Sequence, residues 1–303
     1  MSGIYIYSDV PSTAAELVTF TKQVGKSSTV IAFSTEDAAE LALTGADRVC
    51  LVNGNPMPEN CGKAVAALLR KEEAELLLVG ATARGRDFAA RVAGYLDCGM
   101  ASDISSMSFT DGNLSCERTM FGGAVVQNET LKGLSVVTVP AGKYDPSQGN
   151  SEIVAMDLMA DDRVRVIGVV PIVKKGTDLK AAERVVCIGM GMEKSTDMQM
   201  AEQLAEALGA EIGCSRGIAE ERHWLPVEQY IGISGNVIKP KLYLSMGVSG
   251  QVQHVFGARD SKVIVAINNN DKAPIFRSSD YGIVGDMYEI VPLLTEALKA
   301  ASK

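Results

Sequence analysis

The sequence predicts an α/β protein of two domains, an N-terminal mostly parallel sheet with an antiparallel appendix and a C-terminal parallel-sheet domain. Short, nearly all-apolar segments alternate with helical ones in both halves, which is typical of parallel sheets covered on both faces. The chain has 303 residues, of which 47% are hydrophobic, and this is enough for two cores. Only 5% of the residues are aromatic, so small aliphatic side chains must fill the layers.

The first domain is expected to begin with four strand–helix repeats. Its predicted strands are residues 3–8, 29–33, 48–52 and 76–79, and its predicted helices are residues 12–24, 36–43, 61–73 and 84–96, the first of them capped by Ser12. A hairpin follows at residues 106–110 and 113–118, because Asp111-Gly112 is a turn dipeptide. A strand at residues 136–139 then closes this part of the sheet.

The domain boundary is predicted near residue 173, which divides the chain into residues 1–173 and 174–303. Residues 141–151 are rich in Gly, Pro, Ser, Gln and Asn, and residues 174–180 are polar with little to bury. Between these two stretches, residues 164–170 are expected to form a strand.

The second domain repeats the strand–helix pattern and places polar groups after three of its strands. The predicted strands are residues 184–188, 210–213, 242–248, 262–267 and 283–284, and the predicted helices are residues 196–208, 251–257 and 286–301. Ser215 and Arg216 follow one strand, Ser249 to His254 follow another, and Asn268 follows a third. Ligands of open parallel sheets bind beyond the carboxyl ends of the strands, so we expect a binding site there.

Composition excludes several classes of function. Lys and Arg number 29 against 37 Asp and Glu, a net charge of -8, which argues against nucleic-acid or anionic-membrane binding. No apolar run approaches the ~18 residues of a membrane span, so we expect no membrane insertion. The first ten residues lack the basic and apolar regions of a signal peptide, and we therefore expect a cytoplasmic protein.

The six cysteines do not form a recognisable site. They are scattered without a Cys-x-x-Cys pair, and the chain has only two histidines to accompany them. This spacing fits neither a zinc site nor an iron–sulfur cluster. We expect buried, reduced thiols and no bound metal.

Two glycine motifs are incomplete. Gly189-Met190-Gly191 begins like a dinucleotide-binding fingerprint, but Lys194 stands where the third glycine is needed. Residues 80–85 have the glycine spacing of a Walker loop, but Arg86-Asp87 stands where Lys and Ser or Thr are required. Neither motif by itself predicts a nucleotide site.

The motif at residues 247–250, Gly-Val-Ser-Gly, is more informative. Its glycines let the backbone approach a ligand, and Ser249 is expected to open a helix whose N–H groups can bind an anion. His254 lies one turn into that helix, and Arg216 follows a neighbouring strand. No Ser-His-acid or Cys-His arrangement and no paired carboxylates accompany them. The site is therefore suited to holding a charged cofactor, with no catalytic residues of its own.

The segments that contain these residues resemble the α subunit of electron transfer flavoproteins. The resemblance covers most of the second domain in the family's order and spacing, at residues 213–216, 230–235, 240–244, 247–254, 264–268, 273–276 and 280–286. The first domain is similar more loosely, at residues 78–87 and 118–123.

The resemblance implies an electron carrier and not an enzyme. It implies that the C-terminal domain binds FAD, that the N-terminal domain is a scaffold and partner surface, and that the chain forms a heterodimer with a β subunit carrying AMP or a second FAD. Electrons would pass between a flavoenzyme of the acyl-CoA dehydrogenase or reductase type and a redox partner. The subgroup that the chain resembles serves acyl-CoA reduction or anaerobic metabolism, and electron bifurcation remains open.

The resemblance also places individual residues around the FAD. Ser215 and Arg216 would lie beside the flavin, under a loop of Ile231, Gly232, Ile233 and Ser234. Contacts to the pyrophosphate and ring would come from Ser249, Gly250, Gln251, Val252, Gln253 and His254, and contacts to the adenosine end from Asn268, Asp286 and Met287. Met190 and Ile233 depart from the family, which usually has Arg and Gln at these positions.

Two readings from other classes stay open at this point. An NAD-linked oxidoreductase could be built on the same kind of sheet, although Lys194 interrupts its fingerprint. A nucleotide-binding regulatory module without a redox role could be supported by the first domain alone. The identity of the bound cofactor separates these readings from the electron carrier.

Overall fold

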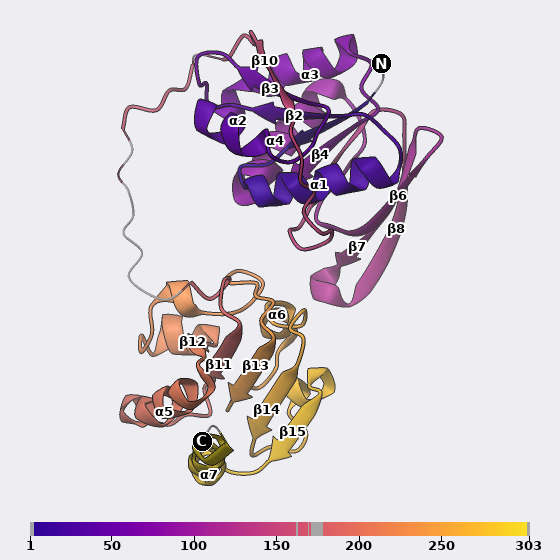
Figure 1. The fold of residues 1–303 in the computed structure, drawn as a ribbon. Helices are drawn as coiled ribbons and strands as arrows, with labels where there is room; N and C mark the ends of the chain where they lie inside the picture. The colour runs from indigo at the N-terminus through magenta and orange to yellow at the C-terminus, as the bar shows by residue number, and fades with distance from the viewer. Residues whose placement is uncertain (1–2, 162, 169, 171–177, 302–303) are drawn as a thin grey trace. The chain divides into compact units, whose positions relative to one another are not determined.

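The computed structural model describes residues 3–161, 163–168, 170 and 178–301. The chain forms two compact units, Met1–Val170 and Pro171–Lys303, which we call the N-terminal and C-terminal units (Figure 1). The predicted boundary near residue 173 lies outside the described residues. Both units are α/β, as the sequence predicts.

The N-terminal unit is built on a seven-stranded sheet in which every neighbouring pair is parallel. The strand order is β10-β3-β2-β1-β4-β9-β5. The strands are β1 (Ile4–Tyr7), β2 (Ser28–Ala32), β3 (Arg48–Val52), β4 (Leu76–Gly80), β5 (Met100–Ala101), β9 (Ser135–Val139) and β10 (Glu152–Met156). The helices are α1 (Pro11–Gln23), α2 (Thr35–Leu41), α3 (Gly62–Lys71) and α4 (Ala83–Leu96), with 3₁₀ turns at η1 (Pro58–Cys61) and η2 (Phe121–Gly123).

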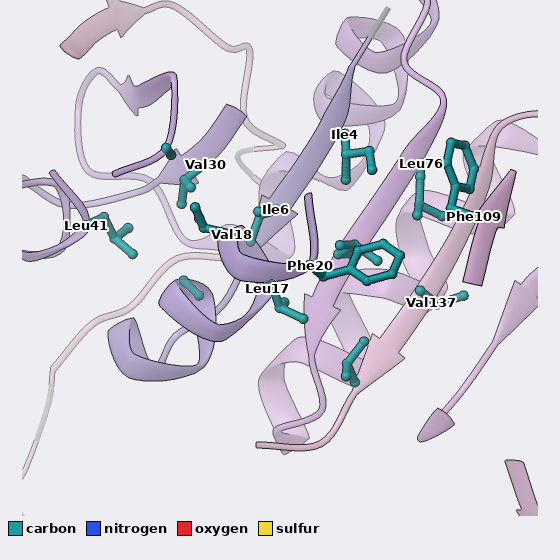
Figure 2. Close-up of a cluster of buried hydrophobic side chains, with 14 of the residues drawn as sticks. Ile4, Ile6, Leu17, Val18, Phe20, Val30, Leu41, Leu76, Phe109 and Val137 are labelled. Atoms are coloured by element: carbon teal, nitrogen blue, oxygen red, sulfur yellow. The ribbon is translucent and has the colours of Figure 1, made fainter. Parts of the chain in front are cut away.

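Side chains of this sheet alternate between two cores, one on each face. Ile4 and Ile6 of β1 pack with α1 and α2 (Figure 2), whereas Tyr5 and Tyr7 pack with α3 and α4. Successive residues of a strand point to opposite faces, so a run of four buried residues in β1 feeds both cores. This explains why the strands read as continuous apolar segments.

The antiparallel appendix is a separate three-stranded sheet. Its strands β6 (Ile104–Thr110), β7 (Asn113–Met120) and β8 (Val125–Lys132) pair in the order β6-β7-β8. Asp111 and Gly112 both have positive φ, 51° and 73°, which confirms the predicted two-residue turn. Phe109 and Leu114 anchor the sheet in the same core as α1.

The structure corrects the prediction in several places. Val10, not Ser12, precedes the first helix, because Pro11 occupies its first turn. Residues 163–168 and 170 form no strand, and Val164 and Val166 are exposed, since no neighbouring strand of the described unit pairs with them. The strands β5, β8 and β10 were not predicted: β5 has two residues, β8 is mostly polar and exposed, and β10 is apolar in sequence but mostly exposed. The strand predicted at residues 136–139 is β9, which lies between β4 and β5, and β10 follows it in the chain and forms the opposite edge of the sheet.

The C-terminal unit contains a five-stranded parallel sheet of order β12-β11-β13-β14-β15. Its strands are β11 (Arg184–Ile188), β12 (Glu211–Cys214), β13 (Leu242–Met246), β14 (Ile264–Asn268) and β15 (Tyr281–Val284). The helices are α5 (Met198–Leu208), α6 (Val252–Phe256) and α7 (Met287–Ala301), with a π turn at η4 (Gly217–Glu221) and 3₁₀ turns at η3 (Ser195–Asp197), η5 (Val227–Gln229) and η6 (Pro274–Ser278).

The two faces of this sheet are covered differently. Helices α5 and α7 pack on the side chains of Val186, Ile188, Leu244 and Met246. The opposite side chains, among them Cys187 and Tyr243, are covered mainly by loop residues. The strand order is β12-β11-β13-β14-β15 (Figure 1). From β11 the chain passes to β12 on one side, and the later strands β13, β14 and β15 lie on the other, so the topological switch point is between β11 and β13. Ligands of such sheets bind at the carboxyl ends of the strands on either side of this switch point.

The described residues contain no metal site and no membrane-spanning helix. No group of three or more His, Cys, Asp and Glu side chains in the described ranges is placed to hold a metal ion. None of the described helices is both long and apolar enough to span a bilayer. All six cysteines are free thiols, and all but Cys98 are buried.

Candidate functional site

At the switch point, the carboxyl ends of β11 and β13 contact each other through backbone atoms of glycines, without side chains between them. The N–H of Gly189 donates to Met246 O at 2.9 Å, and the N–H of Gly191 donates to Gly247 O at 2.9 Å. A Cβ on Gly189 would lie 2.1 Å from the Gly247 carbonyl oxygen. Gly247 has φ +64°, which ends β13 two residues before the prediction. Glycine is required at both strand ends, and a ligand can approach the bare backbone there.

The segment after β13 turns at a second glycine before it enters α6. Gly250 has φ +83°, and a Cβ there would lie 2.2 Å from the backbone nitrogen of Ile275. The exposed Ser249 does not cap the helix, which begins only at Val252 and contains five residues. The anion site predicted from this helix terminus is therefore weak, because so short a helix has little dipole. The turn itself still exposes Gln251, Val252 and Gln253 at the strand end.

His254 is buried beneath that turn. Its Nε2 lies 2.6 Å from the Tyr243 hydroxyl oxygen and 3.9 Å from Cys187 Sγ. Its Nδ1 is buried and makes no hydrogen bond within the described chain. Burial lowers the pKa of His254 from 6.5 to about 4, and the backbone of Ile231 opposes this shift only in part. The ring is therefore neutral at pH 7, with one polar atom left unpaired.

Ser215 and Arg216 follow β12 on the other side of β11. The Ser215 N–H donates to Ile188 O at 2.9 Å, and its buried hydroxyl has no partner in the described chain. The Arg216 side chain is 67% exposed, and its Nε lies 2.5 Å from Glu220 Oε2. The hydrogen bond that Arg216 donates to Glu220 raises the pKa of Arg216. An exposed pair of this kind contributes little stability, so the guanidinium can turn to another anion at small cost.

The loop of residues 230–236 ties these strand ends together. The Ile231 N–H donates to Cys214 O at 2.9 Å, and the Ile233 N–H donates to Gln253 O at 2.8 Å. Gly232 lies against the same carbonyl, which would be 3.1 Å from an added Cβ. Ile231 is buried, whereas Ile233 and Ser234 are exposed. The loop therefore brings the β12 end and α6 to one place, as the predicted site requires.

The three residues predicted at the adenosine end have structural contacts of their own. Asn268 is buried; its amide nitrogen donates to Val248 O at 2.8 Å and its amide oxygen accepts from the Asn270 N–H at 2.9 Å. The exposed Asp286 accepts from the Tyr288 N–H at 2.8 Å at the start of α7. Met287 places its methyl group against Gly191 and Gly247. Asn268 and Met287 therefore shape the strand ends.

Two side chains that the sequence did not predict hold the loop of residues 190–193 after β11 by hydrogen bonds to its backbone. Arg222 donates to the carbonyl oxygens of Met190 and Met192, and its guanidinium carbon lies 4.5 Å from the Trp224 ring centre. The Tyr288 hydroxyl accepts from the Glu193 N–H at 2.8 Å. No local pattern marks these residues, because their partners are distant in the sequence.

Together, the predicted residues from β12, the 230–236 loop and α6 converge at the switch point. The site offers bare backbone, one exposed cation at Arg216, and two buried polar atoms without partners, Ser215 Oγ and His254 Nδ1. Buried polar atoms without partners are uncommon and call for an explanation. A large cofactor with anionic and hydrogen-bonding groups fits this set of donors.

Comparisons with known proteins agree with this fit. Residues 9–167 match the family described as "Electron transfer flavoprotein domain", and residues 178–259 match "Electron transfer flavoprotein FAD-binding domain". The chain is 34% identical, over an alignment of 318 residues, to YdiR of Escherichia coli (strain K12), which carries the description of an electron transfer flavoprotein subunit. It is also 34% identical over 308 residues to Protein FixB of Salmonella typhimurium (strain LT2). Each alignment covers 98% of both chains.

Among solved structures, a thiamin diphosphate-dependent enzyme isolated from Mycobacterium smegmatis is similar only weakly. It is 10% identical with a TM-score of 0.24, over 96% of this chain and 59% of that one. This likeness supports no argument about fold or function.

Proposed function

Because the chain belongs to the electron transfer flavoprotein family as an α-type subunit, we propose that the switch point of its C-terminal unit is the place where it holds FAD. FAD is the cofactor of this family's C-terminal domain. The observation that supports the placement best is the convergence of β12, the 230–236 loop and α6, with two buried polar atoms left unpaired.

We assign the binding roles by position around that point. Ser215, Arg216 and His254 face the flavin, and the loop of Ile231, Gly232, Ile233 and Ser234 lies over it. The turn of Ser249, Gly250, Gln251, Val252 and Gln253 meets the pyrophosphate, while Asn268, Asp286 and Met287 support the adenosine end. The Asn268 and Met287 contacts described above favour an indirect role for both, through the shape of the strand ends.

When bound, FAD supplies the electron-accepting ring, which can take up and release electrons singly or in pairs. The protein's part is to place charge and donors around that ring. Arg216 is an exposed cation held only by Glu220, so it can stabilise negative charge on a ligand. His254 offers a donor that is neutral at pH 7, because burial lowers its pKa to about 4.

We propose that the chain carries electrons and does not make or break bonds in a substrate. Nucleophilic catalysis by its nearby cysteines is disfavoured, since burial raises the pKa of Cys214 to about 12 and raises that of Cys187 as well. A thiol that stays protonated is a poor nucleophile. The remaining polar groups of the site are suited to binding and to tuning a potential.

The partners follow from the family and from the exposed surface. Members of this family form heterodimers with a β subunit and exchange electrons with flavoenzymes. We propose a β subunit that carries AMP or a second FAD, and a flavoenzyme of the acyl-CoA dehydrogenase or reductase type. The N-terminal unit offers apolar side chains for a partner: Phe121 is 81% exposed, and Val125 and Val126 are about half exposed.

Cofactor identity tests this function. The chain is purified with its β subunit, the ligands are released by heat, and they are identified by chromatography against FAD, AMP and NAD. We expect FAD. Release of only AMP or NAD, or a complex that stays colourless after FAD is added, would contradict the proposed function.

A matched pair of variants separates this FAD from any FAD in the β subunit. Ser234→Trp places a large ring at an exposed position in the proposed site. Glu211→Trp places the same ring at an exposed position outside the site, at the amino end of β12. We expect Ser234→Trp to remove one FAD per heterodimer and Glu211→Trp to remove none. Full FAD content in Ser234→Trp would exclude the assigned location.

A further inference from the structure

Three buried polar side chains from different elements meet on one face of the C-terminal sheet. Cys187 of β11 and Tyr243 of β13 are 0% exposed, and His254 of α6 is 9% exposed. The Tyr243 hydroxyl lies 2.6 Å from His254 Nε2, and Cys187 Sγ lies 3.9 Å from the same nitrogen. The remaining neighbours in this core are mostly apolar, so the three groups must satisfy one another.

The protonation of these groups follows from their burial. Burial raises the pKa of Tyr243 and Cys187 well above their ordinary values, so both keep their protons. His254 is neutral, and a neutral imidazole has one nitrogen that donates and one that accepts. Which nitrogen carries the proton is therefore decided by the partners of the ring.

Both sides of the ring indicate a proton on Nδ1. The Tyr243 O–H, whose oxygen lies 2.6 Å from Nε2, can donate to that nitrogen only if Nε2 carries no proton. On the other side, the Ile231 N–H is already donated to Cys214 O at 2.9 Å. The Ile231 backbone group that raises the His254 pKa is therefore its carbonyl, which favours a proton on Nδ1. Because Nδ1 makes no full hydrogen bond within the described chain, that proton stays free for a ligand.

We infer that the Tyr243 hydroxyl is the positioning group of His254: it donates to Nε2 and so keeps the single ring proton on Nδ1, where it is available to the FAD. Only the statement that the Nδ1 proton is available to the FAD rests on the proposed function; the position of the proton does not. The hydroxyl acts through His254 and does not itself touch the cofactor, so Tyr243 is a positioning residue and His254 the contact.

The surroundings of the ring also keep its charge constant. The titratable side chains that contact it are Cys187 from β11 and Tyr243 from β13, and both are protonated at neutral pH. Among the described residues, no ionised side chain contributes to the pKa of His254. His254 therefore supplies the same neutral donor across the physiological range.

Histidine-labelled protein tests the inference directly, because the chain has only two histidines. The full chain is labelled with ¹⁵N-histidine and joined to unlabelled β subunit, and the ring nitrogens are observed by NMR with and without FAD. His223→Gln, at an exposed site, assigns the two rings. We expect a neutral His254 with its proton on Nδ1 from about pH 5.5 to about pH 8.5. A proton on Nε2, or a ring that becomes charged in this range, would overturn the inference.

A matched pair of tyrosine variants tests the role of the hydroxyl. Tyr243→Phe keeps the ring and removes the donor, so we expect a mixture of tautomers and FAD affinity lower by about tenfold. Tyr7→Phe alters a tyrosine that is also buried, in the N-terminal unit, and should change neither the tautomer nor the FAD affinity. Wild-type tautomer signals in Tyr243→Phe would contradict the inference. If that variant does not fold, the wild-type measurement still decides.

The two proposals fail in different ways. A wild-type complex that binds no FAD contradicts the proposed function, while the tautomer, which is measured without FAD, still supports or overturns the role of Tyr243. A complex that binds FAD and carries the proton on Nε2 overturns the role of Tyr243 and leaves the proposed function standing.

Discussion

His254 illustrates how burial changes the chemistry of a single residue in this protein. In the sequence it is one polar residue after a glycine turn, and its position alone predicts a contact with a ligand. In the structure it is 9% exposed and shares a hydrogen bond with a fully buried tyrosine. The sequence predicts the ligand contact, which stays a prediction. It does not predict the protonation of the ring, because the strand order brings Tyr243 and Cys187 to it.

Burial of His254 makes the stability of the C-terminal unit depend on pH. The pKa is about 4 in the folded chain and 6.5 in the unfolded one, so the unfolded state takes up the proton first as the pH falls. Stability is therefore lost as the pH decreases from about 6.5 toward about 4, by about 2 kcal/mol between pH 7 and pH 5. Urea unfolding of the FAD-free chain, followed by the fluorescence of the single Trp224, measures this loss in the C-terminal unit.

Two glutamine variants control for other titrating groups. His254→Gln should remove this pH dependence between pH 7 and pH 5, whereas His223→Gln, which alters an exposed ring, should keep it. An identical pH dependence in the wild type and His254→Gln would show that the ring is not held neutral.

Among the elements, the strands were the most predictable and the short pieces around the site the least. Strand β11 was predicted with its observed bounds because the four residues that follow Arg184 in it are apolar and buried. Helix α6 proved shorter than predicted, and strand β13 ends early at Gly247, whose positive φ leaves the extended region. Strand β10 was missed although four of its five residues are apolar, because it directly follows the polar residues 141–151 that were assigned to the domain boundary.

The glycine that ends β13 carries a prediction of its own. A Cβ on Gly247 would lie 2.5 Å from Met287 Cε and 3.0 Å from Gly191 Cα, in addition to the strain of φ +64°. Gly209 after α5 has φ +59° and only an ordinary contact, 3.4 Å from Arg184 Nη1. Both Gly→Ala variants should lose about 1 kcal/mol from the backbone conformation. Only Gly247→Ala should also displace the switch-point turn.

Calorimetry and FAD titration distinguish the two variants. We expect Gly247→Ala to melt at a lower temperature than Gly209→Ala and to bind FAD more weakly, while Gly209→Ala binds FAD as the wild type does. Equal FAD affinity in the two variants would argue against close approach of the cofactor to this backbone.

At the scale of the whole molecule, the sequence predicted the fold class and the direction of both sheets, because each buried strand is an apolar segment between helices. It did not predict strand order, which depends on how distant segments pack. The switch point between β11 and β13, and the contacts of Arg222 and Tyr288 behind it, were therefore visible only in the structure. Composition only excluded some classes of function. The family itself was identified by the resemblance of the segments at the strand ends.

The position of FAD in the complex of this chain with its β subunit tests the account most directly. A crystal structure of that complex should place an FAD at the carboxyl ends of β11, β12 and β13, with its flavin beside Ser215 and His254 and the 230–236 loop over it. An FAD bound only in the β subunit, or at the strand ends of the N-terminal unit, would contradict the account.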